Sequence, residues 1–362
     1  MLGPVRTFQS QLLRWYAANH RELPWRVTVD MSENAIAPAA IDPYHVLVSE
    51  LMLQQTQVAT VIPYFKRFIG RFPTVGDLAD ADEQDVLRLW QGLGYYSRAR
   101  NLKKAAEMIV RAFEGAMPHD VESLLRLPGV GRYTAGAIAS LAFEQRAPIL
   151  DGNVMRVLCR LDCIKSDPRE RSTREALWAR AEAILPPQQL GNFNSSLMEL
   201  GATICTPRSP KCLFCPVKDH CEAFSKGIAE SIPAPRKAKA MPLLKRSTFC
   251  IRHGKRWLLE QRPSTGRWAG MWQFITVETT PLVPATSPGI PVLDAKRIGN
   301  VSHALTHRRY EFEVWFATAP SKKLGSAPLT RRWLTFEDIS KVPLPRPHVK
   351  IQAMLQSLIA SP

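Results

Sequence analysis

Four cysteines lie close together in the second half of the chain. Cys205, Cys212, Cys215 and Cys221 form a C-x6-C-x2-C-x5-C array. The chain begins without an apolar signal segment and has no run of eighteen or more apolar residues, so we expect a cytoplasmic protein whose thiols stay reduced. In that compartment, four thiols in one loop indicate a metal or iron–sulfur site rather than two disulfides. The fold must therefore bring these four sulfurs together.

The spacing of the cysteines favours one kind of centre. Zinc usually takes two CxxC pairs, and only Cys212 and Cys215 form such a pair. The uneven spacing fits one loop wrapped around a bulkier cluster, so a [4Fe-4S] cluster is preferred over zinc. The other cysteines, Cys159, Cys163 and Cys250, are expected to pack in cores.

The chain is strongly basic. Its 48 Lys and Arg exceed its 32 Asp and Glu, which gives a formal net charge of +16. Such a balance predicts a polyanionic partner, with nucleic acid as the first candidate. The charge alone does not discriminate between DNA, RNA and an acidic membrane surface, and a solvated basic surface without a partner is the alternative.

The length and the local patterns predict two domains. Residues 1–225 are expected to form a helical domain, and residues 226–242 a basic, proline-rich linker. Residues 243–362 contain β-rich runs followed by a helix, which indicates an α/β domain. The expected helices of the first domain include 8–19, 44–68, 83–89, 97–112 and 173–183. The expected strands of the second include 247–252, 256–260, 274–278 and 310–317, with a closing helix at 349–358.

The segment 124–141 carries a separate signal for nucleic-acid binding. Its sequence LPGVG separates two predicted helices, the second starting near Tyr133. Such a hairpin directs backbone amides, here those of Val130, Gly131 and Arg132, toward a phosphate. The pattern is typical of the helix-hairpin-helix of DNA-binding proteins, although a bend used only for packing would look similar.

Two carboxyl groups are candidates for catalysis. Asp151 precedes an apolar helix, where the helix N-terminus favours the anion, although a simple N-cap is the plainer explanation. Glu50 lies within VLVSELMLQQTQV and has mostly apolar neighbours at helical spacing, so burial is expected to raise its pKa. Two carboxyls whose pKa values are driven apart are typical of an acid and an anion that work together.

Several motifs, taken together and in this order, resemble one family. The motifs LPWR at 23–26, SELMLQQTQV at 49–58, LGYYSRARNL at 93–102, LPGVGRYTAGAIAS at 127–140 and ILDGNVMRVLCR at 149–160 are similar to those of the MutY type of adenine DNA glycosylase. The MELGATIC run and the cysteine loop at 205–221 agree with them. The resemblance implies the helix-hairpin-helix glycosylase fold with a [4Fe-4S] loop, followed by a Nudix-like α/β domain.

The resemblance also implies an activity and roles for particular residues. The activity is the flipping and excision of adenine mispaired with 8-oxoguanine or guanine in double-stranded DNA, as part of base excision repair. Glu50 would protonate N7 of adenine and Asp151 would stabilise the sugar cation, with Tyr133 and Asn153 assisting. The implied base and DNA contacts are Trp25 and Arg26 at the adenine, Gln55, Thr56, Leu93 and Tyr95 at the helix wedge and the orphaned base, and Ser302 and His303 at 8-oxoguanine.

Two other functions compete with this one. A bifunctional glycosylase and lyase would need a lysine amine, which in that branch follows the hairpin at the position held here by Tyr133. A non-catalytic iron–sulfur DNA-binding protein would be favoured if either acid were missing, and both are present. We therefore expect a monofunctional, monomeric enzyme with no membrane attachment.

The chain departs from the family pattern at several places. Residues 281–344 contain no glutamate-rich Nudix motif, so hydrolysis of nucleoside diphosphates is not expected of the second domain. Val301 replaces a phenylalanine beside Ser302, and Ser195 replaces a glutamine that usually reaches the adenine edge. Residues 27–41 form an insertion longer than the family usually has.

Overall fold

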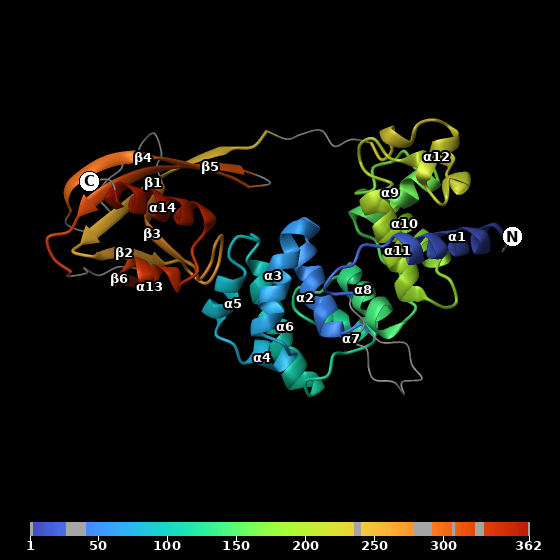
Figure 1. Cartoon of the computed structure of the whole chain (residues 1–362), viewed down its shortest axis with the longest axis horizontal. Coiled ribbons are helices and arrows are strands. Elements are labelled where there is room, and N and C mark those ends of the chain that lie inside the picture. Colours follow the sequence, from blue (N-terminus) through green and yellow to red (C-terminus); the bar gives the residue numbers. More distant parts are fainter. Residues whose placement is uncertain are drawn as a thin grey trace. The chain divides into compact units, whose positions relative to one another are not determined.

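The computed structural model describes residues 3–26, 41–234, 240–278, 292–305, 308–322 and 329–360. The insertion expected at 27–41 lies outside them, apart from Ile41. The chain packs as two compact units, one formed by residues 1–80 and 101–237 and the other by residues 81–100 and 238–362 (Figure 1). Segment 81–100 therefore packs with the C-terminal half of the chain, although helices flank it on both sides in the sequence.

The first unit is built from helices. Its main core contains the apolar faces of α9 (Gly152–Leu161) and α11 (Leu190–Thr203), together with Phe8 and Leu12 of α1 (Gly3–Asn19). Ile232, at the centre of the segment expected to be a linker, is also buried in this core. The helices of the first half of the chain are α1 (Gly3–Asn19), α2 (Pro43–Leu53), α3 (Val58–Arg71), α4 (Val75–Ala79), α5 (Glu83–Leu89) and α6 (Ser97–Phe113). They are followed by α7 (Val121–Leu125), α8 (Arg132–Phe143), α9 (Gly152–Leu161), α10 (Arg171–Ala183), α11 (Leu190–Thr203) and α12 (Glu222–Ser225).

The prediction of a single helix over 44–68 is wrong, because the structure has two helices there, α2 and α3. The Gln54 N–H still donates to the Glu50 carbonyl, but Gln55 adopts a left-handed conformation with φ of 58° and ends the helix. The apolar periodicity continues across this break, which is why the sequence hides it. The break leaves Gln55 and Thr56 in a turn directly after the helix that carries Glu50.

The predicted hairpin at 124–141 is present, with α7 before it and α8 after it. Gly129 has a φ of +82°, and a Cβ at this position would lie 2.7 Å from the Cβ of Asn101, so glycine is needed both for the turn and for the close approach. The Val130 N–H donates to the Leu127 carbonyl at 3.1 Å. The expectation that the Val130 amide points outward to a phosphate is therefore wrong, because that amide closes the turn.

The second unit contains a six-stranded mixed sheet. Its strands are β1 (Leu243–His253), β2 (Arg256–Gln261), β3 (Trp272–Glu278), β4 (Leu293–Leu305), β5 (Arg308–Thr318) and β6 (Arg331–Leu334), in the order β4-β5-β1-β3-β2-β6. β1 and β5 are parallel, and the other paired strands are antiparallel. α14 (Arg346–Ala360) buries Ile351 and Leu355 against one sheet face, beside Phe274 and Phe312. A short helix, α13 (Phe336–Ser340), follows β6.

The expected α/β class of this unit is confirmed, but two of its strands were not predicted. β4 is exposed along most of its length and has no buried alternation at its start, so it lacks the pattern of a strand in the sequence. β6 is only four residues long. Both lie at edges of the sheet, where one side of a strand is not covered by a neighbour.

Candidate active site

A cavity of about 510 Å³ opens in the helical unit. Its size is that of a typical small-ligand pocket. Its walls come from α2 and the turn after it, α8, the start of α9, and α11. It contains eight of the residues predicted for the site, namely Trp25, Arg26, Glu50, Gln55, Thr56, Tyr133, Asp151 and Asn153.

Glu50 is buried, with 5% of its surface exposed. Burial raises the pKa of its carboxyl to about 7, and the nearby Asp151 adds to this effect. The Tyr133 hydroxyl donates a hydrogen bond of 2.7 Å to Glu50 Oε2 and, together with Arg26, opposes the rise in pKa. Glu50 therefore exchanges its proton near neutral pH, as a general acid requires.

Asp151 is the N-cap of α9, as predicted. Its Oδ1 accepts from the Val154 N–H at 2.6 Å, and its Oδ2 accepts from Asn153 Nδ2 at 3.1 Å. The expectation that the helix terminus would hold its pKa below the ordinary value is wrong, because burial outweighs the hydrogen bonds and raises the pKa. The two carboxyls still differ in their hydrogen-bond donors. Asp151 accepts from the Val154 amide and from Asn153, whereas Glu50 accepts from the hydroxyl of Tyr133.

The orientation of Asn153 is fixed by Arg156. The guanidinium of Arg156 donates to Asn153 Oδ1 at 2.9 Å, which leaves the amide nitrogen facing Asp151. The same side chain donates to the carbonyls of Gly201 at 2.6 Å and Cys205 at 2.7 Å. A short series of hydrogen bonds thus joins Asp151 to the first residue of the cysteine loop.

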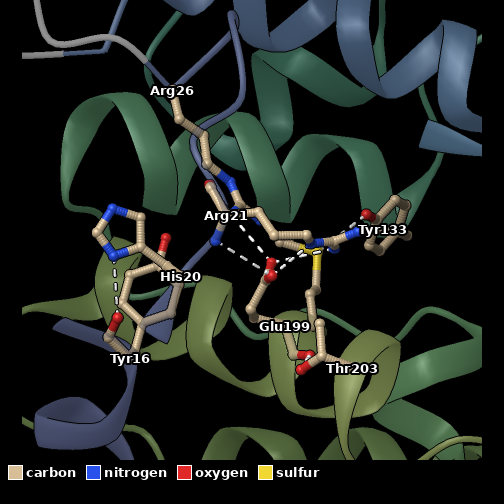
Figure 2. A network of polar contacts seen from close by, with 8 residues as sticks. Tyr16, His20, Arg21, Arg26, Tyr133, Glu199 and Thr203 are labelled. Carbon is tan, nitrogen blue, oxygen red and sulfur yellow. Dashed lines mark hydrogen bonds and ion pairs between the residues drawn. The ribbon is translucent and has the colours of Figure 1, made fainter. Parts of the chain in front are cut away.

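Glu199 is a pocket residue that the sequence analysis missed. Its side chain is fully buried on α11, where Arg21 Nε donates to its Oε1 at 2.5 Å and Arg26 donates to its Oε2 at 3.0 Å (Figure 2). These arginines hold the pKa of Glu199 below its ordinary value although burial works against them. The available signal was a glutamate inside an apolar helix, within the MELGATIC run.

The four cysteines lie against the core of the helical unit. Burial raises the pKa of the Cys215 thiol, and Cys205, Cys221 and Cys212 act in the same direction. Cys205 Sγ and Cys221 Sγ both contact Arg160, at 3.2 Å from its Nη1 and 3.4 Å from its carbonyl. Among the described residues, no group of three or more His, Cys, Asp or Glu is placed to hold a single metal ion. Four cysteine thiols in one loop are the donor set that a [4Fe-4S] centre takes.

Arg160 supports this loop from inside the protein. It is 2% exposed and donates to the carbonyls of Ile232, Thr206 and Pro207 and, at 3.2 Å, to Cys205 Sγ. Hydrogen bonds to thiolate ligands are one of the means by which proteins tune iron–sulfur clusters. The residues present therefore fit the expected group.

A second pocket, of about 580 Å³, belongs to the sheet unit and brings together Leu93, Tyr95 and His303. Tyr95 is 40% exposed, and the ring of His303 lies 6.1 Å from that of Trp268. Burial lowers the pKa of His303, and the positive charges of Lys350, Arg346 and Arg267 lower it further, so this histidine is neutral at pH 7. Aromatic rings and cations around one space are suited to an electron-rich base and its phosphates.

Four predicted contacts, Ser195, Ser302, Val130 and Gly131, lie outside these pockets. Ser195 lines a separate cavity of about 400 Å³, together with Arg26 and Leu141, and does not line the cavity of Glu50. Ser302 is exposed on β4, and its carbonyl accepts from Lys350 Nζ at 3.2 Å. Gly131 begins α8 as its N-cap and lines neither pocket.

The hairpin, the paired acids and the cysteine loop define a class of DNA repair protein. Residues 48–183 match the HhH-GPD superfamily of base excision DNA repair proteins, and residues 247–354 match the NUDIX domain. A thermostable thymine-DNA glycosylase has a similar structure, with a TM-score of 0.53 and 29% identity over 62% of this chain and 97% of that one. A trapped covalent complex of endonuclease III with DNA gives a TM-score of 0.51 and 25% identity over 63% of this chain and 100% of that one.

Sequence comparison then identifies the family. The adenine DNA glycosylase of Mus musculus is 36% identical over 93% of this chain and 75% of its own length. The adenine DNA glycosylase of Buchnera aphidicola (strain Sg) is 38% identical over 76% of each chain. The chain belongs to the adenine DNA glycosylase family. The predicted fold class is confirmed, and no helix in the described part of the chain is long and apolar enough to cross a membrane.

Proposed function

We propose that this protein is a monofunctional DNA N-glycosylase that removes adenine mispaired with 8-oxoguanine or guanine. The observation that carries the proposal is a buried Glu50 with a pKa of about 7 in the same pocket as Asp151. An acid that keeps its proton near neutrality is what the departure of adenine requires, because the base is a poor leaving group as an anion. The names of the related glycosylases support adenine as the base.

The proposed reaction begins once adenine has left the DNA stack and entered the pocket. Glu50 transfers its proton to N7, the bond between the sugar and N9 breaks, and its electron pair leaves with the base. Asp151 stabilises the positive charge on the sugar, and water then adds to C1′ while its proton returns to a carboxylate. Arg21 and Arg26 keep Glu199 ionised, which supports a role for this carboxylate as an acceptor for the exocyclic amine of adenine.

The lyase alternative would require an amine in the pocket. The described residues that line it include no lysine, and Tyr133 donates its hydrogen bond to Glu50 instead. We therefore expect single-turnover cleavage of a duplex with adenine opposite 8-oxoguanine to show strand breaks only after treatment with alkali. Breaks without alkali, above all in a duplex that carries an oxidised thymine, would contradict the monofunctional assignment.

We further propose that Cys205, Cys212, Cys215 and Cys221 hold a [4Fe-4S] cluster with a structural role, in a protein that acts as a cytoplasmic monomer on chromosomal DNA. A bound cluster would hold the loop in one fixed conformation. Arg160 and Arg156 on α9 already contact Cys205 of that loop. Purified protein should contain about four irons and absorb in the visible range. Cys215→Ser should lose both signals, whereas Cys163→Ser should keep them, because Cys163 lies outside the loop.

A further inference from the structure

A second cavity of the helical unit lies next to the cavity of Glu50. It has a volume of about 400 Å³ and is lined by side chains from α1, the end of α8 and the start of α11. Arg26 and Leu141 line both cavities, so the two spaces adjoin at these side chains. The volume is within the range of pockets that hold a whole small molecule. A small molecule released beside Glu50 would therefore have a second space next to it.

Flat side chains line one part of this second cavity. The rings of Tyr16 and His20 lie 4.9 Å apart and are tilted by 32°. His20 Nδ1 donates to the Tyr16 carbonyl at 2.9 Å, which fixes the histidine ring beside the tyrosine (Figure 2). The guanidinium carbon of Arg26 lies 5.9 Å from the centre of the Tyr16 ring. Aromatic rings and guanidinium planes are the surfaces on which nucleobases stack in proteins.

The same cavity contains polar side chains whose hydrogen bonds are not used. Ser195 is 4% exposed and Tyr16 is 9% exposed, but neither hydroxyl has a hydrogen-bond partner among the described residues. The side-chain amides of Gln189 and Asn192 are exposed and have no partner in that part of the chain either. A buried hydroxyl without a partner costs free energy, so a molecule in the cavity that supplies donors and acceptors is stabilised there.

The arginine and the glutamate of the lining are already paired. Arg26 Nη1 donates to Glu199 Oε2 at 3.0 Å. The two oxygens of Glu144 accept from the Leu190 and Gly191 amides at 2.8 Å and 3.1 Å. The hydroxyl and amide groups that remain can both donate and accept hydrogen bonds. Such a lining suits a flat, neutral and polar molecule better than a phosphate.

We propose that this second cavity is a binding site for a free purine base and holds adenine after its release from the deoxyribose. Free adenine is flat and neutral, and its ring nitrogens and amine offer acceptors and donors. Its transfer to the second cavity would empty the cavity that contains Glu50 and Asp151. The exposed amides of Gln189 and Asn192 place one side of the site at the surface, from which the base can leave. The choice of adenine rests on the proposed glycosylase activity.

The first experiment measures binding of labelled adenine to the full-length protein by equilibrium dialysis without DNA. Two sites are expected, one in the cavity of Glu50 and one in the second cavity. His20→Ala and Asn192→Ala should each weaken one site by about fivefold or more, through loss of a stacking ring or a hydrogen bond. Glu50→Gln should affect only the other site. Asn19→Ala is the matched control for Asn192→Ala, because Asn19 is exposed on α1 and does not line the cavity. A single site that responds to Glu50→Gln alone would overturn the inference.

The second experiment follows the base after excision. A duplex with labelled adenine opposite 8-oxoguanine is cleaved in a single turnover, and rapid filtration separates the protein from free base. The wild-type protein and Asn19→Ala should retain labelled adenine after the bond has broken, whereas His20→Ala and Asn192→Ala should retain less. Equal retention by all four proteins would overturn the inference. If no adenine is excised at all, the proposed function fails instead, and the dialysis result still shows whether the second site exists.

Discussion

The two pockets of this protein differ in the charged side chains that line them. The pocket of the helical unit contains the carboxyls Glu50, Asp151 and Glu199 beside Arg21 and Arg26, whereas the pocket of the sheet unit contains Arg100, Arg267 and Arg346. In the first, burial moves the pKa of Glu50 to about 7, where it can exchange a proton. In the second, cations lie beside the exposed ring of Tyr95 and the neutral His303.

The difference in charge indicates different tasks for the two pockets, chemistry for the pocket of the helical unit and recognition for the pocket of the sheet unit. Carboxyls out of water are costly, so a site that keeps them is one that uses their protons or charges. Cations beside aromatic rings are less costly to expose and suit the binding of bases and phosphates. Substitutions in the first pocket should therefore change the rate of excision, and substitutions in the second should change which mispair is preferred.

The largest effect is expected for Asp151→Asn. The amide cannot stabilise a positive sugar, so the single-turnover rate should fall by at least about 10³-fold, while affinity for the duplex is retained. Asp162→Asn is the matched control, because Asp162 ends the same helix and pairs with Arg180. Rapid excision by Asp151→Asn would remove the basis for assigning the anion, and equal losses in both variants would point to damage of α9 instead.

The next effect concerns the proton on Glu50. Glu50→Gln should slow excision by about 10²- to 10⁴-fold, because an amide cannot protonate the base. In the wild-type protein the rate should fall as the pH rises through about 7, since the protonated fraction of Glu50 falls there. Single-turnover rates measured across this pH range test the assignment, and a flat profile would contradict it.

Two further measurements sharpen the assignment of Glu50. Tyr133→Phe removes a hydrogen bond that lowers the pKa of Glu50, so the fall in rate should move to higher pH. The folded protein also keeps a proton that the unfolded chain loses above a pKa of 4.5, so this group makes stability decrease as the pH rises from 4.5 to about 7. Glu50→Gln should remove that part of the pH dependence of chemical denaturation.

Where the residues belong to short motifs, the sequence predicted well which of them share the pocket of the helical unit. Asp151 caps the helix that follows it, and Glu50 lies on the apolar helix whose pattern indicated burial. The break after α2 was not predicted, because it depends on the left-handed conformation of Gln55 while the apolar pattern runs on. The direction of the pKa shift of Asp151 was also missed, since a helix terminus is visible in a sequence and the extent of burial is not.

Contacts between distant segments were the least predictable part of the site. Glu199 acquires its role from Arg21 and Arg26, which precede it by more than 170 residues. β4 carries His303, yet its exposed polar start gives no strand pattern, and it forms because β5 pairs with it. Such features depend on tertiary packing, and a single sequence does not show which segments will meet.

The smallest effect is expected for His303→Ala. Truncation of a neutral ring beside Trp268 should reduce the preference for adenine opposite 8-oxoguanine over adenine opposite guanine by about fivefold, or ~1 kcal/mol, with little change in the limiting rate. Because the pKa of His303 is lowered by burial and by Lys350, Arg346 and Arg267, the preference should not vary between neutral and mildly alkaline pH. His253→Ala is the control, since this histidine ends β1 and contacts the Ala319 carbonyl. An equal loss on both mispairs would show that the second pocket contributes general affinity rather than recognition, and the contrast between the two pockets would then reduce to one of charge alone.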